Sequence, residues 1–240
     1  MSIPEPAARR TQPNADSAAE DYLKTIYQHT EWQSDPVTPS VLASSMGVAP
    51  SSVTEMAKKL SAAGLVNYAP YKPLTLTAEG VARARGVIRR HRIIETWLVD
   101  EMGYDWHEVH DEAEVLEHSI SERLLDAIDS RLGHPRSDPH GDPIPSAAGT
   151  VDESSALLLS SAAVGTSGAV VRISDRDPSL LLSLAAAGIR PSTMISVVSR
   201  HDDAGFVVRV AGAPGADADT AALVPVSASG GSSIWISAPA

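Results

Sequence analysis

The chain has 240 residues, of which 43% are hydrophobic, and a formal net charge of −11 at pH 7. This length allows two small domains with connecting segments rather than one. Cysteine is absent, which excludes a disulfide framework and thiolate zinc sites, so a bound metal must use oxygen and nitrogen ligands.

The N-terminal segment, residues 1–15, contains Pro4, Pro6 and Pro13 and lacks the apolar centre of a secretory signal. We interpret it as a flexible arm. No apolar run of about 18 residues occurs anywhere in the chain, so we expect no membrane span and no membrane partner. Without a secretory signal or a membrane span, our default expectation is a cytoplasmic protein.

The next elements have the order of a winged helix-turn-helix. A helix over residues 17–30 is indicated by an apolar stripe and by Asp16 or Ser17 as its cap. A second helix covers residues 39–46, Gly47 suits the turn after it, and Pro50 begins a third helix that ends at Gly64. Extended segments at residues 65–68 and 74–77 would form the wing.

The third helix is the candidate DNA-reading element, because a helix fits the major groove and contacts bases from its first turns. Its exposed side chains are small hydroxyls and lysines, with no Arg, Asn or Gln for bidentate base contacts, so DNA shape and dimer spacing should supply much of the specificity. The alternative is a packing fold that serves protein contacts. The predicted DNA-binding residues are Pro50, Ser51, Ser52, Thr54, Lys58 and Lys59, with Lys72 at the wing tip.

The charge is segregated along the chain. Residues 49–92 hold eight Lys and Arg against two Glu, whereas residues 95–129 hold twelve Asp and Glu against one Arg. Phosphate binding needs a local basic surface rather than a basic protein. The acidic segment would oppose DNA until cations neutralise part of it, although two solvated helix faces of opposite sign would give the same pattern.

Three further helices are predicted before a change in composition. Thr77 caps a long helix to about residue 101, a second helix covers residues 106–119, and Ser121 caps a third with apolar positions to Leu132. Residues 133–150 form a Pro-rich linker. Residues 151–240 show short apolar runs at 169–173, 195–198, 206–210, 223–226 and 234–236, which favour a small β-barrel with one helix near residues 179–187.

A cluster of potential metal ligands lies in the acidic region. Glu114, Glu117 and His118 have the i, i+3, i+4 spacing that places side chains on one helix face, and His91 and Glu95 are spaced i, i+4. A salt-bridged helix face would explain the first group alone. Oxygen-rich ligation with one or two nitrogens suits a hard divalent cation such as Mn²⁺.

Five motifs follow one another along residues 16 to about 132: Glu20-Asp21-Tyr22-Leu23-Lys24-Thr25-Ile26-Tyr27, Val48-Ala49-Pro50-Ser51-Ser52-Val53-Thr54, Leu76-Thr77-Ala78-Glu79-Gly80, His91-Arg92-Ile93-Ile94-Glu95 and His110-Asp111-Glu112-Ala113-Glu114-Val115-Leu116-Glu117-His118. In this order they resemble the diphtheria-toxin-repressor family of metal-dependent transcription factors. The resemblance implies a winged helix-turn-helix domain at 16–80, a helical metal-binding and dimerisation domain at 81–132, and an SH3-like β-barrel domain at 151–240.

The resemblance also implies a homodimer that binds double-stranded operator DNA when loaded with metal and represses metal-homeostasis genes. The primary ligands it implies are Asp21, Glu114, Glu117 and His118. The resemblance implies Met at the position of Asp21 and Cys at the position of Glu114 in iron-responsive members of the family. This chain has carboxylates at both positions, which favours Mn²⁺ over Fe²⁺. Lys24 stands where compact manganese regulators carry a metal-bridging Glu, which argues against a closely coupled ion pair of that style.

A second, ancillary site is implied at His91, Glu95 and His110. In compact manganese regulators the residue that matches His91 joins the primary site instead, so the assignment of His91 stays open between the two sites. Full-length members add a ligand from the C-terminal domain, for which Asp177 is predicted and Asp175 is the competitor.

Three alternatives remain beside a manganese-dependent repressor. The first is an iron-responsive regulator of the same family. The second is a carboxylate-ligated metalloenzyme, which the missing second Glu-x-x-His ligand pair and the lack of an obvious substrate cavity disfavour; we therefore expect no catalytic residues and no small-molecule substrate. The third is a metal-independent regulator.

Overall fold

The computed structural model describes residues 15–33, 35–152, 155–201, 205–211 and 222–238. Residues 1–14 of the expected arm therefore lie outside the described residues. The chain forms two compact units, Met1–Ile88 and Arg89–Ala240, and the helix α4 (Ala78–Asp100) runs through the boundary between them.

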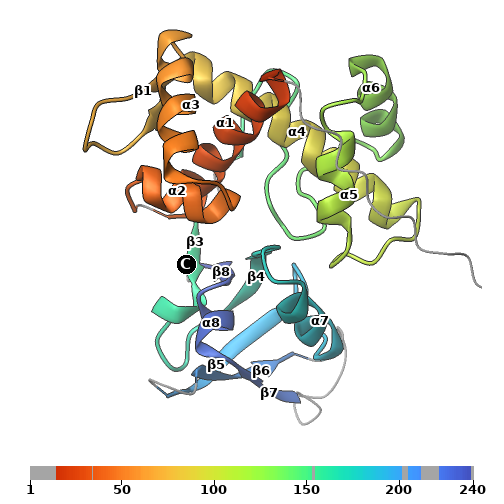
Figure 1. Cartoon of the computed structure of the whole chain (residues 1–240). Coiled ribbons are helices and arrows are strands. Elements are labelled where there is room, and N and C mark those ends of the chain that lie inside the picture. The colour runs from red at the N-terminus through yellow and green to blue at the C-terminus, as the bar shows by residue number, and fades with distance from the viewer. Residues whose placement is uncertain (1–14, 34, 153–154, 202–204, 212–221, 239–240) are drawn as a thin grey trace, which may run out of the picture. The chain divides into compact units, whose positions relative to one another are not determined.

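The first unit is a winged helix-turn-helix, as predicted (Figure 1). Its core is formed by apolar side chains from all of its elements, including Leu23, Val53 and Leu74. The strands pair antiparallel, Val66 with Leu76. The elements are α1 (Ala15–Trp32), α2 (Pro39–Met46), α3 (Pro50–Ala62), β1 (Val66–Asn67), β2 (Thr75–Leu76) and the start of α4.

Local sequence signals explain where these helices begin and end. The Thr38 hydroxyl caps α2 by accepting a hydrogen bond from the Val41 N–H at 3.2 Å. Gly47, with φ of 64°, closes α2 in the left-handed conformation that Gly tolerates. The Thr77 hydroxyl accepts from the Gly80 N–H at 3.1 Å, which confirms the predicted cap of α4.

The helical part of the second unit consists of the remainder of α4, α5 (Val109–Leu116) and α6 (Glu122–Arg131). Ser121 caps α6 as predicted, accepting from the Leu124 N–H at 3.3 Å. The helix expected over residues 106–119 is shorter than predicted, because residues before Val109 and after Leu116 form turns. Glu117 still continues the helical pattern, since its N–H bonds to the Ala113 carbonyl at 2.9 Å.

The Pro-rich segment at 133–150 connects the helices to the C-terminal strands, but part of it is packed. An isolated bridge pairs Ser137 with Pro143 and closes a loop. Within this loop Asp138, His140 and Asp142 are all buried. The proline and glycine content that predicted a linker instead shapes a tight, buried turn.

The C-terminal part of the second unit is an antiparallel sheet of six strands in the order β3-β8-β4-β5-β6-β7. All five apolar runs identified in the sequence lie in strands, and the predicted helix is α7; the short β3 and α8 were not predicted. The bounds are β3 (Ala156–Leu158), β4 (Ser167–Ile173), α7 (Pro178–Ala186), β5 (Met194–His201), β6 (Gly205–Val210), β7 (Ala222–Val226), α8 (Ala228–Gly231) and β8 (Ile234–Ser237), with a 3-10 turn at Leu159–Ser161.

Trp106 joins the two parts of the second unit. It comes from the turn before α5 and belongs to the core cluster of the C-terminal part, together with Ile173 of β4 and Ile189 from the segment between α7 and β5. The Ile173 N–H bonds to the His140 carbonyl at 2.9 Å, which attaches the buried loop to the end of β4. Among the described residues, no helix is long and apolar enough to cross a membrane.

Candidate metal centre

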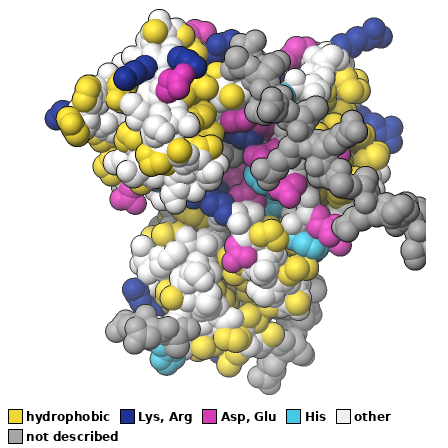
Figure 2. All heavy atoms as spheres, in the orientation of Figure 1, with side chains coloured by type: hydrophobic (Ala, Val, Ile, Leu, Met, Phe, Trp, Pro, Cys, Tyr) yellow, Lys and Arg dark blue, Asp and Glu magenta, His cyan; other side chains and the backbone are white. Residues whose placement is uncertain are grey.

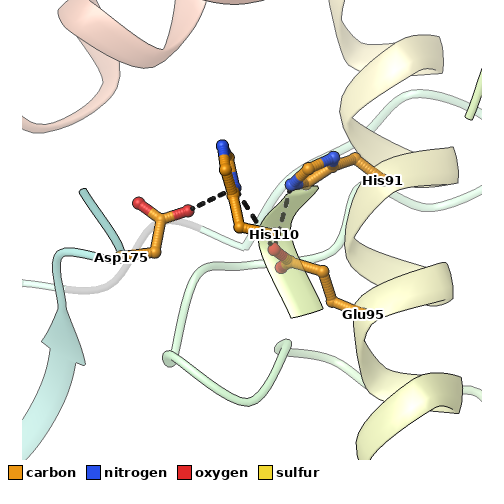
Figure 3. A group of neighbouring side chains, drawn as sticks. All are labelled: His91, Glu95, His110 and Asp175. Carbon is orange, nitrogen blue, oxygen red and sulfur yellow. Dashed lines mark ion pairs between the residues drawn. The ribbon is translucent and has the colours of Figure 1, made fainter. Parts of the chain in front are cut away.

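Four side chains from three segments of the second unit meet in one cluster (Figure 3). His91 and Glu95 stand one turn apart on α4, His110 comes from α5, and Asp175 follows β4. Glu95 Oε1 lies 3.0 Å from His91 Nε2 and 3.5 Å from His110 Nδ1, and the same His110 nitrogen lies 3.1 Å from Asp175 Oδ2.

The donor set of this cluster fits a divalent cation. Both Glu95 oxygens and His110 Nδ1 are buried and make no hydrogen bond within the described part of the chain. Buried polar atoms without hydrogen bonds are costly, and convergent atoms of this kind are a feature of metal sites. Two imidazoles and two carboxylates would offer a cation such as Mn²⁺ the nitrogen and oxygen ligands that it accepts.

Protons partly offset these charges in the metal-free protein. Burial alone would lower the pKa of His110, but contacts with Asp175, Glu114 and Glu95 raise it to about 12. Burial would raise the pKa of Glu95, yet the neighbouring histidines hold it well below its ordinary value. A metal bound here must displace the proton of His110, because only the neutral ring can ligate.

A second group of predicted ligands adjoins the first through His91. Its Nδ1 lies 2.6 Å from Glu117 Oε2, while Nε2 faces Glu95, so the ring stands between two buried carboxylates. His118 Nε2 lies 3.4 Å from the other oxygen of Glu117. Glu114 is half-exposed and faces His110 Nε2 at 3.5 Å, so it differs in burial from Glu117, which directly follows the end of the same helix.

Asp21, the remaining predicted primary ligand, lies on α1 in the first unit. Its carboxylate is therefore carried by a different compact unit from Glu114, Glu117 and His118. The joint ligand set of these four residues stays a prediction.

The structure distinguishes between the two candidate ligands of the C-terminal domain, Asp177 and Asp175. Asp177 is exposed and caps α7, where its Oδ1 accepts from the N–H groups of Ser179 and Leu180 at 3.0 and 3.2 Å. Asp175 instead points into the cluster toward His110, and its side chain is 16% exposed. The geometry thus favours Asp175, the competitor, over the predicted Asp177.

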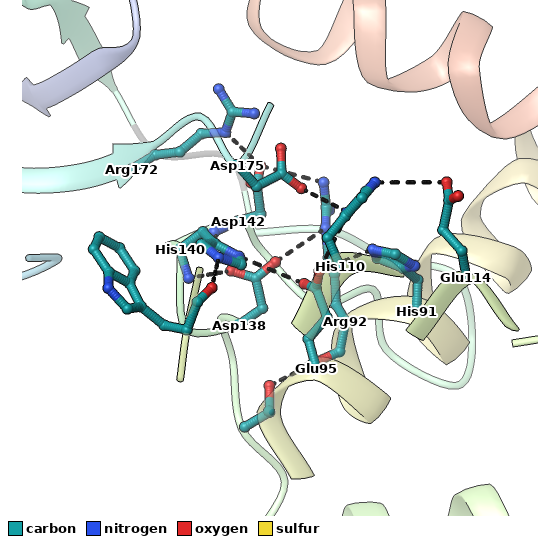
Figure 4. A network of polar contacts seen from close by, with 12 residues as sticks. His91, Arg92, Glu95, His110, Glu114, Asp138, His140, Asp142, Arg172 and Asp175 are labelled. Atoms are coloured by element: carbon teal, nitrogen blue, oxygen red, sulfur yellow. Dashed lines mark hydrogen bonds and ion pairs between the residues drawn. The ribbon is translucent and has the colours of Figure 1, made fainter. Parts of the chain in front are cut away.

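A buried acidic loop beside the cluster was missed by the sequence reasoning (Figure 4). Asp138, His140 and Asp142 alternate with proline and glycine in the segment that was interpreted as a linker. Burial together with the charges of Asp142 and Glu95 raises the pKa of Asp138 to about 8. The alternating Asp138, His140 and Asp142 could have indicated a possible ligand group in the sequence.

The predicted DNA-reading residues lie on the outer face of α3. Val53, Ala57 and Leu60 are buried and Met56 is partly buried, whereas most of the other side chains of the helix are exposed. Lys59 pairs with Glu55 at 2.8 Å, and Figure 2 shows basic and acidic side chains next to one another at the upper end of this helix. The exposed residues include Pro50, Ser51, Ser52, Lys58 and Lys59 on the helix and Lys72 in the wing, while Thr54 is half-buried.

Comparison with known proteins agrees with this architecture. The family profile described as "Iron dependent repressor, N-terminal DNA binding domain" matches residues 16–74, and "Iron dependent repressor, metal binding and dimerisation domain" matches residues 77–146. The iron-dependent repressor IdeR of Mycobacterium tuberculosis (strain ATCC 25618 / H37Rv) is 31% identical over 192 residues, which is 74% of this chain and 82% of that protein. This chain belongs to the diphtheria-toxin-repressor family.

Other members of the diphtheria-toxin-repressor family support the assignment. The diphtheria toxin repressor of Corynebacterium efficiens is 35% identical over 129 residues, 54% of this chain and 56% of that protein. A solved manganese-dependent transcriptional repressor in complex with manganese has a TM-score of 0.85 and 42% identity, covering 92% of this chain and all of that one. The structure of ScaR with bound Cd²⁺ has a TM-score of 0.77, 29% identity and 95% coverage of this chain, with all of that chain covered.

The C-terminal sheet also has a family counterpart. Residues 157–216 match the profile of the FeoA domain, in agreement with the predicted all-β domain after the helices. As a member of the diphtheria-toxin-repressor family, the chain combines a DNA-binding domain with a metal-binding and dimerisation domain. The family is one of DNA-binding transcriptional repressors.

Proposed function

We propose that this chain is a manganese-dependent transcriptional repressor that binds operator DNA as a metal-loaded homodimer in the cytoplasm. The observation that carries the proposal is the donor set. Every candidate ligand is a carboxylate or an imidazole. Asp21 and Glu114 occupy the two positions at which the resemblance implies the sulfur ligands Met and Cys in iron-responsive members. Hard oxygen donors favour Mn²⁺ over softer competitors.

Two ligand groups are proposed. Asp21, Glu114, Glu117 and His118 would form the primary site, and His91, Glu95, His110 and Asp175 the ancillary site. His91 would be oriented by Glu117 on one side and would offer Nε2 to the ancillary site on the other, in keeping with its two carboxylate contacts. Carboxylates that orient a ligating imidazole raise its basicity and fix its ring.

The regulatory mechanism follows from where the ligands sit. Asp21 belongs to the DNA-binding unit, whereas Glu114, Glu117 and His118 belong to the second unit. A shared divalent cation would supply the positive charge that lets these acidic groups approach one another. Asp21 would then hold the reading helix of each subunit at the separation that two half-sites on DNA require.

In the metal-free protein these acidic groups repel one another, which favours other arrangements of the two units. The metal-loaded arrangement is selected because the ligands bind the cation better there than in any other arrangement. By linkage, operator DNA must tighten metal binding by the same factor.

The test is operator binding by the full chain against free metal concentration. A duplex obtained by in vitro selection would be followed by fluorescence anisotropy with Mn²⁺, with anaerobic Fe²⁺ and with a chelator. We expect Mn²⁺ to promote binding and the chelator to reverse it. Binding that ignores the chelator would support a metal-independent regulator, and a stronger response to Fe²⁺ would support an iron-responsive one.

A matched pair of variants tests the proposed link between the units. Asp21→Ala should abolish Mn²⁺-dependent operator binding, because it removes the only proposed ligand on α1. Asp35→Ala, which removes an exposed acid of the same unit, should leave the response unchanged. An unchanged metal response in the Asp21 variant would remove this residue from the ligand set.

A further inference from the structure

The loop at residues 137–143 is built to hold two side chains against α4. Asp138 Oδ1 accepts hydrogen bonds from the N–H groups of His140 and Asp142 at 2.8 and 2.9 Å, and the Asp138 N–H bonds back to the Asp142 carbonyl at 3.0 Å. Gly141, with φ of 92°, sits where a Cβ would overlap the Val171 carbonyl of β4. The loop is therefore fixed, with Oδ1 of Asp138 used structurally and its Oδ2 making neither backbone bond.

The orientation of His140 is decided by its contact with Trp106. His140 Nε2 lies 2.7 Å from the Trp106 carbonyl oxygen, and because a carbonyl can only accept, Nε2 must carry the proton. The rings of the two residues are stacked at 5.6 Å. In the neutral ring Nδ1 then carries the lone pair, which is the arrangement found in metal-ligating histidines whose other nitrogen donates to a carbonyl.

Nδ1 of His140 faces a carboxylate. Nδ1 is buried, makes no hydrogen bond among the described residues, and lies 3.6 Å from Glu95 Oε2, which likewise makes none. This separation is too long for a hydrogen bond. Two ligand atoms that each lie about 2.1 to 2.2 Å from one ion are separated by about 3.0 to 3.6 Å, so the gap suits a shared cation.

The positive side chains around the loop pair mainly with Asp142. Both nearby arginines are directed at Asp142: Arg172 Nε lies 2.6 Å and Arg92 Nη2 lies 3.3 Å from its Oδ1. Arg92 also donates to the Pro143 carbonyl at 2.6 Å, and its Nε is 3.7 Å from Asp138 Oδ2, beyond hydrogen-bond distance. Asp142 is thus neutralised, while Asp138 faces a guanidinium only at this longer distance and its carboxyl group stays buried close to that of Glu95.

We propose that Glu95, Asp138 and His140 form a further divalent-cation site, suited to Mn²⁺, beside the ancillary site. One ligand atom from each of the three lies within 4.8 Å of the others, and all three residues are buried. Glu95 is common to both sites: Oε1 faces His91 and His110, and Oε2 faces His140. Its carboxylate would bridge two neighbouring ions.

The experiment counts the ions bound to the full-length protein. Native mass spectrometry after Mn²⁺ saturation and desalting would compare the wild type with His140→Gln and Asp138→Asn. The Gln amide can still donate to the Trp106 carbonyl but lacks the ring lone pair, and Asn keeps an oxygen for the two backbone bonds. His134→Gln, which changes a histidine whose side chain is 70% exposed, is the control.

Both loop variants should bind one Mn²⁺ fewer per subunit than the wild type and the control. Electron paramagnetic resonance of the saturated wild type should show exchange coupling between two manganese ions, and both loop variants should lose it. Circular dichroism melting identifies a misfolded variant, in which case the other variant decides. Equal ion counts in all folded proteins would overturn the proposal and leave a protonated His140 paired with Glu95.

The proposal goes beyond the proposed repressor function, and the two can fail separately. Ion counting needs no DNA, so a protein that binds the extra ion but ignores operator DNA would contradict only the function. Unchanged ion counts together with Mn²⁺-dependent operator binding would contradict only the additional site.

Discussion

At the residue scale, the second unit uses single side chains for more than one contact. His91 lies between Glu95 and Glu117, and Glu95 lies between three histidines. If these residues ligate metal as proposed, they would couple the neighbouring sites, because a change at one residue would alter the charge and geometry of both. Neighbouring residues can also differ completely in role, as the two aspartates after β4 show.

Substitution of these two aspartates should give opposite results. Asp175→Ala should weaken Mn²⁺ binding at the ancillary site by at least about tenfold, because it removes the carboxylate that faces His110. Asp177→Ala should leave metal affinity unchanged but lower the free energy of unfolding by about 1 kcal/mol, because it removes the α7 cap. Metal titration and urea unfolding of both variants distinguish the roles, and an unchanged affinity in the first would exclude Asp175 as a ligand.

Metal binding should release protons. In the metal-free protein, burial lowers the pKa of His110 and His140, but surrounding carboxylates raise it to about 12 and about 10, so both rings are protonated at neutral pH. Only the neutral rings could serve as the proposed ligands, so Mn²⁺ affinity should rise with pH, by about tenfold per pH unit for each proton displaced.

Calorimetric titration in buffers of different ionisation enthalpy measures this proton release. The observed enthalpy should vary linearly with the ionisation enthalpy of the buffer. A binding enthalpy that is independent of the buffer would show that these histidines are already neutral before metal binds.

At the element scale, α4 connects the DNA-binding unit to the candidate metal ligands. Its start is fixed in the first unit, where the Thr77 hydroxyl donates to the Gly64 carbonyl at 2.7 Å and accepts from the Gly80 N–H. Its later turns carry His91 and Glu95. One continuous helix thus passes from the wing to the ancillary cluster.

Two glycines of α4 should respond oppositely to alanine. A Cβ at Gly80 would overlap the Leu65 carbonyl, so Gly80→Ala should destabilise the protein by roughly 1 to 3 kcal/mol. Gly86 has open space around the same position, so Gly86→Ala should stabilise by about 0.5 to 1 kcal/mol through improved helix propensity. Urea unfolding of the metal-free protein measures both, and a neutral Gly80→Ala would mean that the helix start can shift.

At the scale of the whole molecule, basic and acidic residues occupy different segments of the chain. The sequence from the reading helix to the middle of α4 is basic, and the segment that follows is acidic, within a chain of net charge −11. Phosphate contacts by lysines give salt-dependent affinity that is independent of DNA sequence. The exposed lysines of α3 and the wing should therefore set the salt dependence of operator binding.

Lys58 should matter more than Lys59 for this dependence. Lys59 is paired with Glu55 at 2.8 Å, whereas Lys58 is exposed and three residues along the helix from that Glu. Lys58→Ala should reduce the slope of log affinity against log salt concentration by about 0.9 for each phosphate that the variant no longer neutralises. Anisotropy titrations over a range of salt concentrations measure the slope, and an equal or larger change in Lys59→Ala would contradict the ranking.

The sequence by itself determined most of the helices, the strands after residue 165 and the carboxylate and imidazole chemistry of the candidate ligands. Caps such as Thr77 and Ser121 act over three residues, and apolar periodicity acts over one element, so both can be recognised locally. Only the tertiary structure decided that Asp175 rather than Asp177 faces His110, and that His140 in the apparent linker faces Glu95. Those choices depend on how a loop packs against a helix more than forty residues earlier in the chain, and such long-range packing leaves no pattern in the local sequence.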